Sequence, residues 1–369
     1  MRTIAAALCL CLLAAAVPAQ QVERVHPSGN LLTRHLDEAN VHPPARIGRL
    51  TVFGVTLNRA DRLPGVLTMD QALAKNVLLI EELASAHVNR ARFVNKSASQ
   101  MIFLMAGEVL TGGKQNRTLA TDALLGPNSA TVLPIYCVQK GRWRGTGGFA
   151  KVTAVAPQAV RERAAQDAGQ DAVWKAVARA NRRLNSATGS DDLAAAMAKP
   201  ENARRFSGLR RRIAPKLPAG CAGVVVAVGA NIVGADLFNS PELFAAMRDK
   251  VLDSYLSQYG DQATVRHGVA GRPSQLDVRD YLQACYRARF TPADTRGVGK
   301  VYDIRGARFG QTLAYEGTSA VRSRVPVRPR RCMVHTALMQ QVVPVRPTPV
   351  PGRPVPLPRP RPWPEVPRR

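Results

Sequence analysis

Short runs of alternating apolar and polar residues recur through the first half of the chain, which is the period of a half-buried β-strand. Glycine, proline and asparagine separate several of these runs, as expected of turns. The pattern predicts strands at residues 47–57, 77–80, 88–94, 101–110 and 131–138. It also predicts one short helix, at residues 69–75. The first half of the chain is therefore predicted to be β-rich.

Helical periodicity begins after residue 157. Apolar residues at 173, 177, 180 and 184 recur every three or four positions and predict an amphipathic helix; shorter helices are predicted at 191–198 and 203–213. A valine-rich run between two glycines, residues 223–229, predicts a buried strand. Ser240 and Pro241 are typical of a helix start, and Gly260 is typical of its end.

Residues 260–300 are rich in glycine, proline and arginine and are predicted to be mostly loop. Later strands are predicted at 301–305, 311–315 and 332–337. The helices and strands follow no regular strand–helix–strand rhythm. This order predicts an α+β fold, with a β-rich first half followed by helices and a strand–helix unit.

The N-terminus has the pattern of a secretory signal peptide, with Arg2, an apolar run at residues 4–17 and small residues before Gln20. We therefore expect residues 1–19 to be cleaved and the protein to be secreted or periplasmic. The apolar run is shorter than the roughly 20 residues of a membrane span, and no transmembrane segment is predicted. Residues 20–46 are polar, contain His26, His35 and His42, and are expected to form a poorly ordered or wrapping arm.

The C-terminal tail, residues 339–369, is predicted to be disordered and proline-rich. From 344 to 367 a proline recurs every two or three residues, with arginines between them. Proline fixes φ and lacks a donor, which favours an extended polyproline II chain. Such a tail could be a solvated end, a basic anchor on an anionic envelope surface, or a PxxP-type ligand. The sequence favours a solvated end over specific recognition, and the anchor over the PxxP-type ligand.

The protein is strongly basic, with a net charge of +26 from 52 basic and 26 acidic residues. Removing Arg2 and the net +10 of residues 322–369 leaves +15 on the remaining chain. This charge predicts attraction to polyanions such as envelope lipids, anionic glycans or nucleic acid. An arginine-rich proteome would produce the same composition without any such role. Aromatic residues make up only 5% of the chain, so specific recognition of nucleic acid by stacking is not expected.

Four cysteines follow the signal region, and an even number in an exported chain permits two disulfides with three possible pairings. One bridge, or four buried free thiols, also remains possible. Their wide spacing disfavours a zinc site, and no metal site or cofactor is predicted. The four residues are Cys137, Cys221, Cys285 and Cys332.

The densest polar motif runs from Glu108 to Arg117 and contains a Gly-Gly-Lys-Gln-Asn-Arg string. It lacks the spacing of a P-loop. Its glycines are typical of a turn that brings backbone close to a ligand, and its polar side chains suit an anion or a sugar. An internal ion pair between Glu108 and Arg117 is the structural alternative. The candidate ligand-binding residues are Glu108, Lys114, Gln115, Asn116, Arg117 and Arg142.

This motif, together with Cys137 and the Gly-Arg-Trp at 141–143, resembles the ARPP-type domain family, named for its association with ADP-ribosylglycohydrolase and rhodanese-phosphatase genes. Later matching positions are Trp174, residues 223–229, Gly234-Ala-Asp-Leu-Phe238, the helix after Ser240 and Val334-His335. The resemblance implies one composite domain over residues 47–338. It implies no established activity. Where the family has an acidic residue two positions after the cysteine, this chain has Gln139.

Two functions are compatible with these features. The first is an exported binding or structural protein with a polar ligand site around the Glu108 to Arg117 loop. The alternative is a hydrolase-like enzyme that uses Glu108 and Arg117 on a phosphorylated or ADP-ribose-like substrate. His335, on a predicted strand, is more typical of a core histidine than of a catalytic base. Catalytic residues and the oligomeric state are not determined by the sequence.

Overall fold

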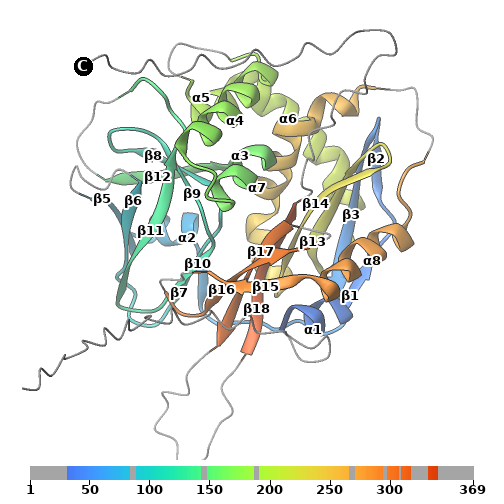
Figure 1. Cartoon of the computed structure of the whole chain (residues 1–369), viewed down its shortest axis with the longest axis horizontal. Helices are drawn as coiled ribbons and strands as arrows, with labels where there is room; N and C mark the ends of the chain where they lie inside the picture. The colour runs from blue at the N-terminus through green and yellow to red at the C-terminus, as the bar shows by residue number, and fades with distance from the viewer. Residues whose placement is uncertain are drawn as a thin grey trace, which may run out of the picture.

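A computed structural model describes residues 31–83, 89–142, 148–186, 191–265, 271–293, 297–306, 309–316 and 331–339. The predicted signal peptide, the first part of the predicted arm, Trp143 and nearly all of the predicted tail lie outside the described residues. Figure 1 shows two β-rich parts side by side, with a group of helices above and between them. The α+β prediction is confirmed.

The larger part is a nine-stranded sheet with the order β1-β3-β13-β14-β18-β17-β16-β15, in which β2 pairs with β3. All of its strand pairs are antiparallel. Its strands are β1 (Ala39–Val41), β2 (Ala45–Ile47), β3 (Leu50–Leu57), β13 (Cys221–Val228), β14 (Asn231–Phe238), β15 (Arg289–Pro292), β16 (Lys300–Arg305), β17 (Phe309–Glu316) and β18 (Arg331–Met339).

Both faces of this sheet are covered, because successive side chains of a strand point to opposite faces. Val224 and Val226 of β13 pack in one core with α7 (Pro241–Tyr259), while Val225 packs in another. The second core contains α1 (Leu31–Asp37) and α8 (Gln275–Gln283). The uninterrupted valine run is therefore the pattern of a strand buried on both sides.

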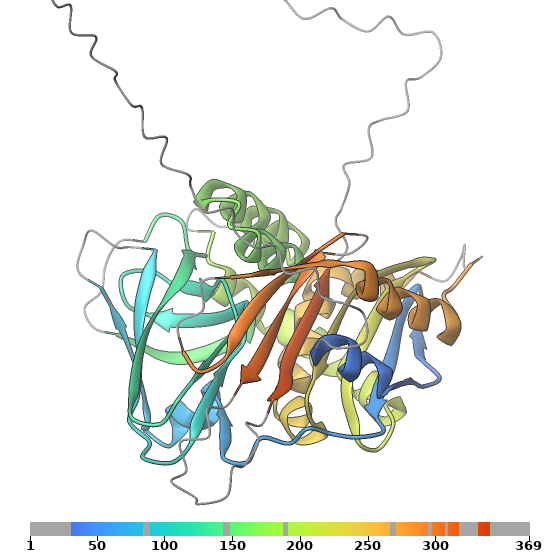
Figure 2. The same ribbon diagram turned by 60° about the horizontal axis from the view of Figure 1, so that its bottom comes forward.

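The smaller part is a six-stranded sheet with the order β12-β8-β9-β11-β6-β5, beside a three-stranded sheet with the order β10-β7-β4. The six-stranded sheet curls until its two edges meet (Figure 2). A methyl group on Gly148 would lie only 2.1 Å from the carbonyl oxygen of Ile80, which shows how closely β12 approaches β5. The strands are β4 (Val66–Thr68), β5 (Leu78–Glu82), β6 (Arg90–Asn95), β7 (Met101–Leu104), β8 (Glu108–Gly112), β9 (Arg117–Leu119), β10 (Ala123–Leu125), β11 (Ser129–Cys137) and β12 (Phe149–Val155).

Helices connect the two parts and cover their junction (Figure 1). The core that contains α7 also contains Phe103 and Val109 of the smaller part, so the two parts share buried surface. The remaining helices are α2 (Met69–Ala74), α3 (Gln158–Ala165), α4 (Gln170–Arg183), α5 (Leu193–Ala198) and α6 (Pro200–Ile213). Among the described residues, no helix is both long and apolar enough to cross a membrane.

Two regions differ from the sequence-based prediction. Residues 31–46, expected to be a poorly ordered arm, form α1, β1 and most of β2, because Leu32, Leu36 and Val41 are buried in the second core. Residues 260–300, expected to be mostly loop, contain α8. A capping box between Ser274 and Asp277 begins this helix, and its apolar face packs on the large sheet.

Candidate functional site

Gln139 holds together the loop that contains the Gly-Gly-Lys-Gln-Asn-Arg string. Its side-chain oxygen accepts hydrogen bonds from the backbone of Asn116, at 3.2 Å, and from Nε of Arg142, at 2.7 Å. Its side-chain nitrogen donates to Asp192, at 2.8 Å. The loop between β8 and β9 is thereby fixed to the end of β11 and to the first turn of α5.

The other amide side chains of the loop also bond within the protein. Asn116 donates to Asp192 at 3.0 Å, and its oxygen accepts from the guanidinium of Arg142 at 3.4 Å. Gln115 donates to the backbone oxygen of Gln139, at 3.1 Å, and accepts from the Cys137 thiol, at 3.3 Å. The polar residues predicted to face a ligand therefore converge, but Gln115, Asn116 and Arg142 stabilise the loop itself.

Lys114 is half-buried in the same loop, and its backbone N–H donates to the carboxylate of Glu82 at 2.9 Å. Gly113, with φ of +54°, lies against that carboxylate: a methyl group there would be 2.5 Å from its oxygen. The loop thus follows a left-handed path that a residue with a side chain would adopt only with strain. The two adjacent glycines bring the loop backbone against β5.

Arg117 has a different environment from the other loop residues. It lies directly opposite Leu110 on one side and Cys137 on the other, and directly opposed residues of antiparallel strands point to the same face. Leu110 belongs to the core enclosed by the curled sheet, so Arg117 also points into the end of that enclosure. Only 4% of Arg117 is exposed.

The guanidinium of Arg117 is buried, and no carboxylate of the described residues forms an ion pair with it. Its Nε has no hydrogen-bond partner within the described residues, and none of the ion pairs there includes it. Burial lowers the pKa of Arg117, and the nearby Cys137 and Glu82 offset this only in part. The Nε atoms of Arg49, Arg161, Arg205 and Arg272 also have no partner within the described residues, but Arg117 is the one of these five in the polar loop that the sequence singled out. A buried arginine without an acceptor is costly, and an anionic group would complete this position.

Glu108 does not form the ion pair with Arg117 that the sequence suggested as an alternative. Its carboxylate accepts from the backbone of Met105, at 2.9 Å, and from the ammonium of Lys250 in α7, at 2.5 Å. Lys250 also binds Asp70 of α2. Burial raises the pKa of Glu108. Burial acts to lower the pKa of Lys250, but the two carboxylates outweigh it and the pKa is raised.

A second buried ionic cluster centres on His335. Its Nδ1 is 2.7 Å from Asp122, and its Nε2 is 3.2 Å from Asp236. Asp236 also accepts two hydrogen bonds from the guanidinium of Arg161, at 2.6 and 3.1 Å. Burial acts to lower the pKa of His335, but the two aspartates outweigh it and raise the pKa to about 9. His335 is thus a core residue with both ring nitrogens occupied.

The turn between β7 and β8 connects the two ionic clusters. The backbone of Met105 donates to Glu108, and that of Ala106 donates to Asp122 at 2.7 Å. Gly107, with φ of +90°, packs on Arg161, whose Cγ would lie 2.4 Å from an added methyl group. Sequence reasoning identified Glu108 and His335 but missed Asp122, Arg161 and Lys250. The buried partners of an ion pair are far apart in sequence and carry no local pattern.

The four cysteines in the described part of the chain are not joined in disulfides. Cys137, Cys285 and Cys332 are buried, and Cys221 is half-buried. No group of His, Cys, Asp or Glu in the described ranges is arranged to hold a metal ion.

Comparison with known proteins gives one match. Residues 38–325 match the model of the ARPP-1 family, described as ARG and Rhodanese-Phosphatase-superfamily-associated Protein domain. This confirms the resemblance noted from the motif around Glu108 and Arg117. The comparisons with curated proteins and with solved structures gave no match.

Proposed function

Because the chain belongs to the ARPP-1 domain family, which brings no activity with it, we propose from the site alone that the protein binds a ligand through a small anionic group held by Arg117. The group is a phosphate or a carboxylate. The observation that supports this proposal is the buried guanidinium of Arg117, whose Nε has no acceptor within the described residues.

The chemistry of arginine suits this role. Its planar fork can donate two parallel hydrogen bonds to a carboxylate or phosphate, and charge-assisted bonds of this kind are about twice as strong as neutral ones. Losing the hydration of a buried cation costs several kcal/mol unless an anion compensates it. Arg117 is already desolvated in the folded protein. An anion that pairs with it would therefore require little further desolvation of the protein.

Once Arg117 is counted, the loop region has one net positive charge, which favours an anion over a cation. Lys114 and Arg142 lie in the same loop region as Arg117 and add positive charge, against Glu82 and Asp192. The hydrogen bonds of Gln139 fix the loop, so the site would be largely formed before the ligand arrives. A rigid site loses less entropy on binding, which is the usual advantage of preorganisation.

The hydrolase alternative has less support from the geometry. Glu108, the proposed acid or base, is completely buried and is paired with Lys250 rather than with Arg117. Both nitrogens of His335 are bonded to carboxylates, which leaves neither for a substrate proton. Binding is therefore the function that we propose, and hydrolysis is the weaker candidate.

Thermal unfolding of the full chain with increasing inorganic phosphate, or ribose 5-phosphate as an organic probe, tests this function. A ligand that binds only the folded state stabilises it, by about 2.7 kcal/mol at 100 times its dissociation constant. Arg117→Gln should abolish the rise in melting temperature, and Arg117→Lys should keep part of it. Arg90→Gln, at an exposed arginine in the neighbouring β6, is the matched control. An equal rise in Arg117→Gln and Arg90→Gln would refute the proposal.

We further propose that the protein acts outside the cytoplasm. The support is the order of a basic residue, an apolar run and small residues within residues 1–19. N-terminal sequencing of the protein from its native host should find a chain that begins near Gln20. A chain that retains Arg2 and the apolar run would contradict export by this route.

A further inference from the structure

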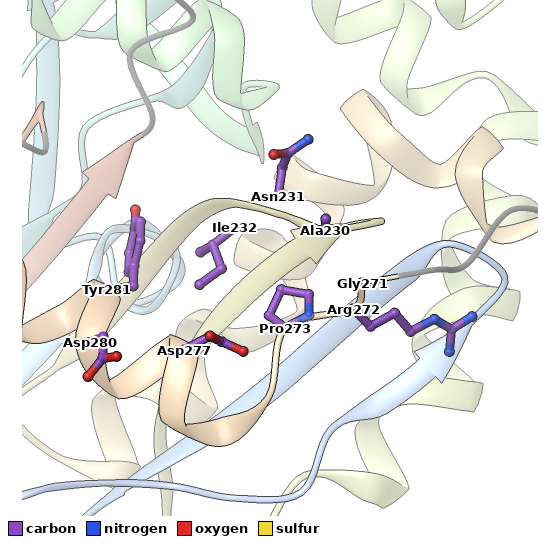
Figure 3. Close-up of a pocket in the computed structure, with 9 residues that line it drawn as sticks. All are labelled: Ala230, Asn231, Ile232, Gly271, Arg272, Pro273, Asp277, Asp280 and Tyr281. Carbon is purple, nitrogen blue, oxygen red and sulfur yellow. The ribbon is translucent and has the colours of Figure 1, made fainter.

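A groove of about 530 Å³ lies between α8 and the tip of the β13–β14 hairpin (Figure 3). The hairpin contributes Asn231 and Ile232, and the chain entering α8 contributes Arg272 and Pro273. The helix contributes Asp277, Asp280 and Tyr281. This groove lies on the face of the large sheet that α8 covers, and Arg117 does not line it.

The lining of the groove combines an apolar side chain, Ile232, with charged ones of both signs, because Arg272 lies in it beside the two aspartates. Ile232 is half-buried, whereas Pro273 and Tyr281 are buried and offer little of their surface to a ligand. Asp277 and Asp280 are exposed and are three residues apart on α8, so both belong to the same helical face. Asp277 accepts hydrogen bonds from Ser274 at the start of α8, so Asp280 is the carboxylate better placed to meet a ligand. Two aspartates against Arg272 leave the groove with one net negative charge, which suits an extended ligand that is positively charged.

The end of the described chain lies close to this groove. Met339, the last residue of β18, is directly opposite Gly234 of β14. The two strands are antiparallel, so the chain leaves Met339 in the direction of Asn231, three residues further along β14. At about 3.3 Å per residue this is a path of roughly 10 Å.

The sequence that follows Met339 has the matching chemistry. Pro344-Val-Arg-Pro347 begins five residues later, and Pro351-Gly-Arg-Pro354 repeats its pattern. Residues 344–354 contain two arginines, Arg346 and Arg353, and no acidic residue. Proline-rich segments bind aromatic grooves as preformed polyproline II helices, because little chain entropy is lost on binding.

We propose that residues 344–354 of this chain dock in the groove between α8 and the β13–β14 hairpin, with Arg346 beside Asp280. Because the segment is covalently attached a few residues away, its effective concentration at the groove is in the millimolar range. Weak contacts are then sufficient to keep the groove occupied. The tail is thereby a ligand of its own domain, in contrast to the solvated end or envelope anchor that its composition alone favours.

Fluorescence quenching in the full chain tests this docking. Leu276 on α8 is 67% exposed and can be replaced by a cysteine that carries a bimane label. Cys221→Ala removes the one thiol among the described residues that is not fully buried, and Cys9→Ser and Cys11→Ser remove the two cysteines of the predicted signal peptide. Tryptophan quenches bimane on contact, so Thr348→Trp should reduce bimane emission relative to the same labelled chain with Thr348. Added salt should restore the emission, because exposed charge pairs are screened.

Two further substitutions separate docking from accidental proximity. Arg346→Gln and Asp280→Asn should each restore emission, whereas Asp171→Asn, at an exposed aspartate in the first turn of α4, should leave it quenched. Emission that is unaffected by Thr348→Trp would overturn the proposal. So would quenching that increases with protein concentration, because that result would assign the groove to the tail of a second copy.

Discussion

Gln139 shows how one residue can determine the chemistry of a loop. The family resemblance implies an acidic residue at this position, where this chain has Gln139. In the structure the side chain must both donate, to Asp192, and accept, from Asn116 and Arg142. An amide can do both at neutral pH, whereas an ionised carboxylate has no proton to donate.

Gln139→Glu should therefore destabilise the protein. The new carboxylate would lie where Gln139 now contacts Asp192 at 2.8 Å, and like charges at this distance repel. We expect a loss of about 1–3 kcal/mol in the free energy of unfolding at pH 7, measured by urea denaturation. Adding Asp192→Asn should recover most of the loss. If Gln139→Glu is as stable as the wild type, the proposed hydrogen-bond network is wrong.

His35 in α1 makes the protein sensitive to acid. Burial lowers its pKa to about 3, and its Nε2 has no hydrogen-bond partner in the described part of the chain. The unfolded chain takes up the proton near pH 6.5, whereas the folded chain does not, so stability falls as pH decreases below 6.5. Between pH 7 and pH 5 the expected loss is about 2 kcal/mol. His35→Leu should flatten this part of the urea-derived pH profile, and an unchanged slope would contradict the assignment.

At the level of elements, Lys250 joins three segments that are distant in sequence. From α7 it reaches Glu108 at the start of β8 and Asp70 in α2. The two acids are not equivalent, because the Glu108 side chain is buried and that of Asp70 is 44% exposed. The pair with Glu108 should therefore contribute more to the attachment of α7.

Lys250→Met tests this difference. Removing the ammonium leaves Glu108 buried without a cation, which should cost about 3–5 kcal/mol. Asp70→Asn removes only a partly exposed partner and should cost at most about 1 kcal/mol. Chemical denaturation of both variants measures the two losses. Equal losses would mean that Glu108 is not the main partner of Lys250.

The His335 cluster links β14, β18 and α3, and it should make these contacts sensitive to alkali. The pKa of His335 is raised to about 9, so the protonated ring stabilises the fold below pH 6.5 and this contribution is lost as pH rises to 9. The expected loss is about 3 kcal/mol. Urea unfolding at several pH values should show it in the wild type and not in His335→Gln. A slope that persists in His335→Gln would assign the effect to other groups.

For the whole molecule, the sequence predicted most single elements but not how they assemble. The strand at 223–229, the helix after Ser240 and the strands at 301–305 and 311–315 were found because burial and capping leave local patterns. α8 was missed although Ser274 and Asp277 form a capping box, because the surrounding glycines and arginines suggested loop. The sheet order depends on contacts between residues more than 100 positions apart, and the local periodicity of the sequence does not predict such contacts.

The candidate site was predicted in part for the same reason. The sequence identified the loop and its polar residues, and the structure brings Gln115, Asn116 and Arg142 together. The sequence could not show which of these side chains form hydrogen bonds within the protein and which does not. Arg117 differs from its neighbours in this respect because the register of β8, β9 and β11 turns its side chain into the enclosed core.

Arg117→Met tests whether the fold keeps Arg117 as a buried cation for a ligand. We would measure thermal and urea unfolding of the full-length variant with no phosphate or carboxylate in the buffer. We expect unchanged or greater stability, by up to about 1–3 kcal/mol, because an uncompensated buried charge is replaced by an apolar side chain of similar length. A loss of several kcal/mol would show that Arg117 has a partner inside the fold and would contradict the claim.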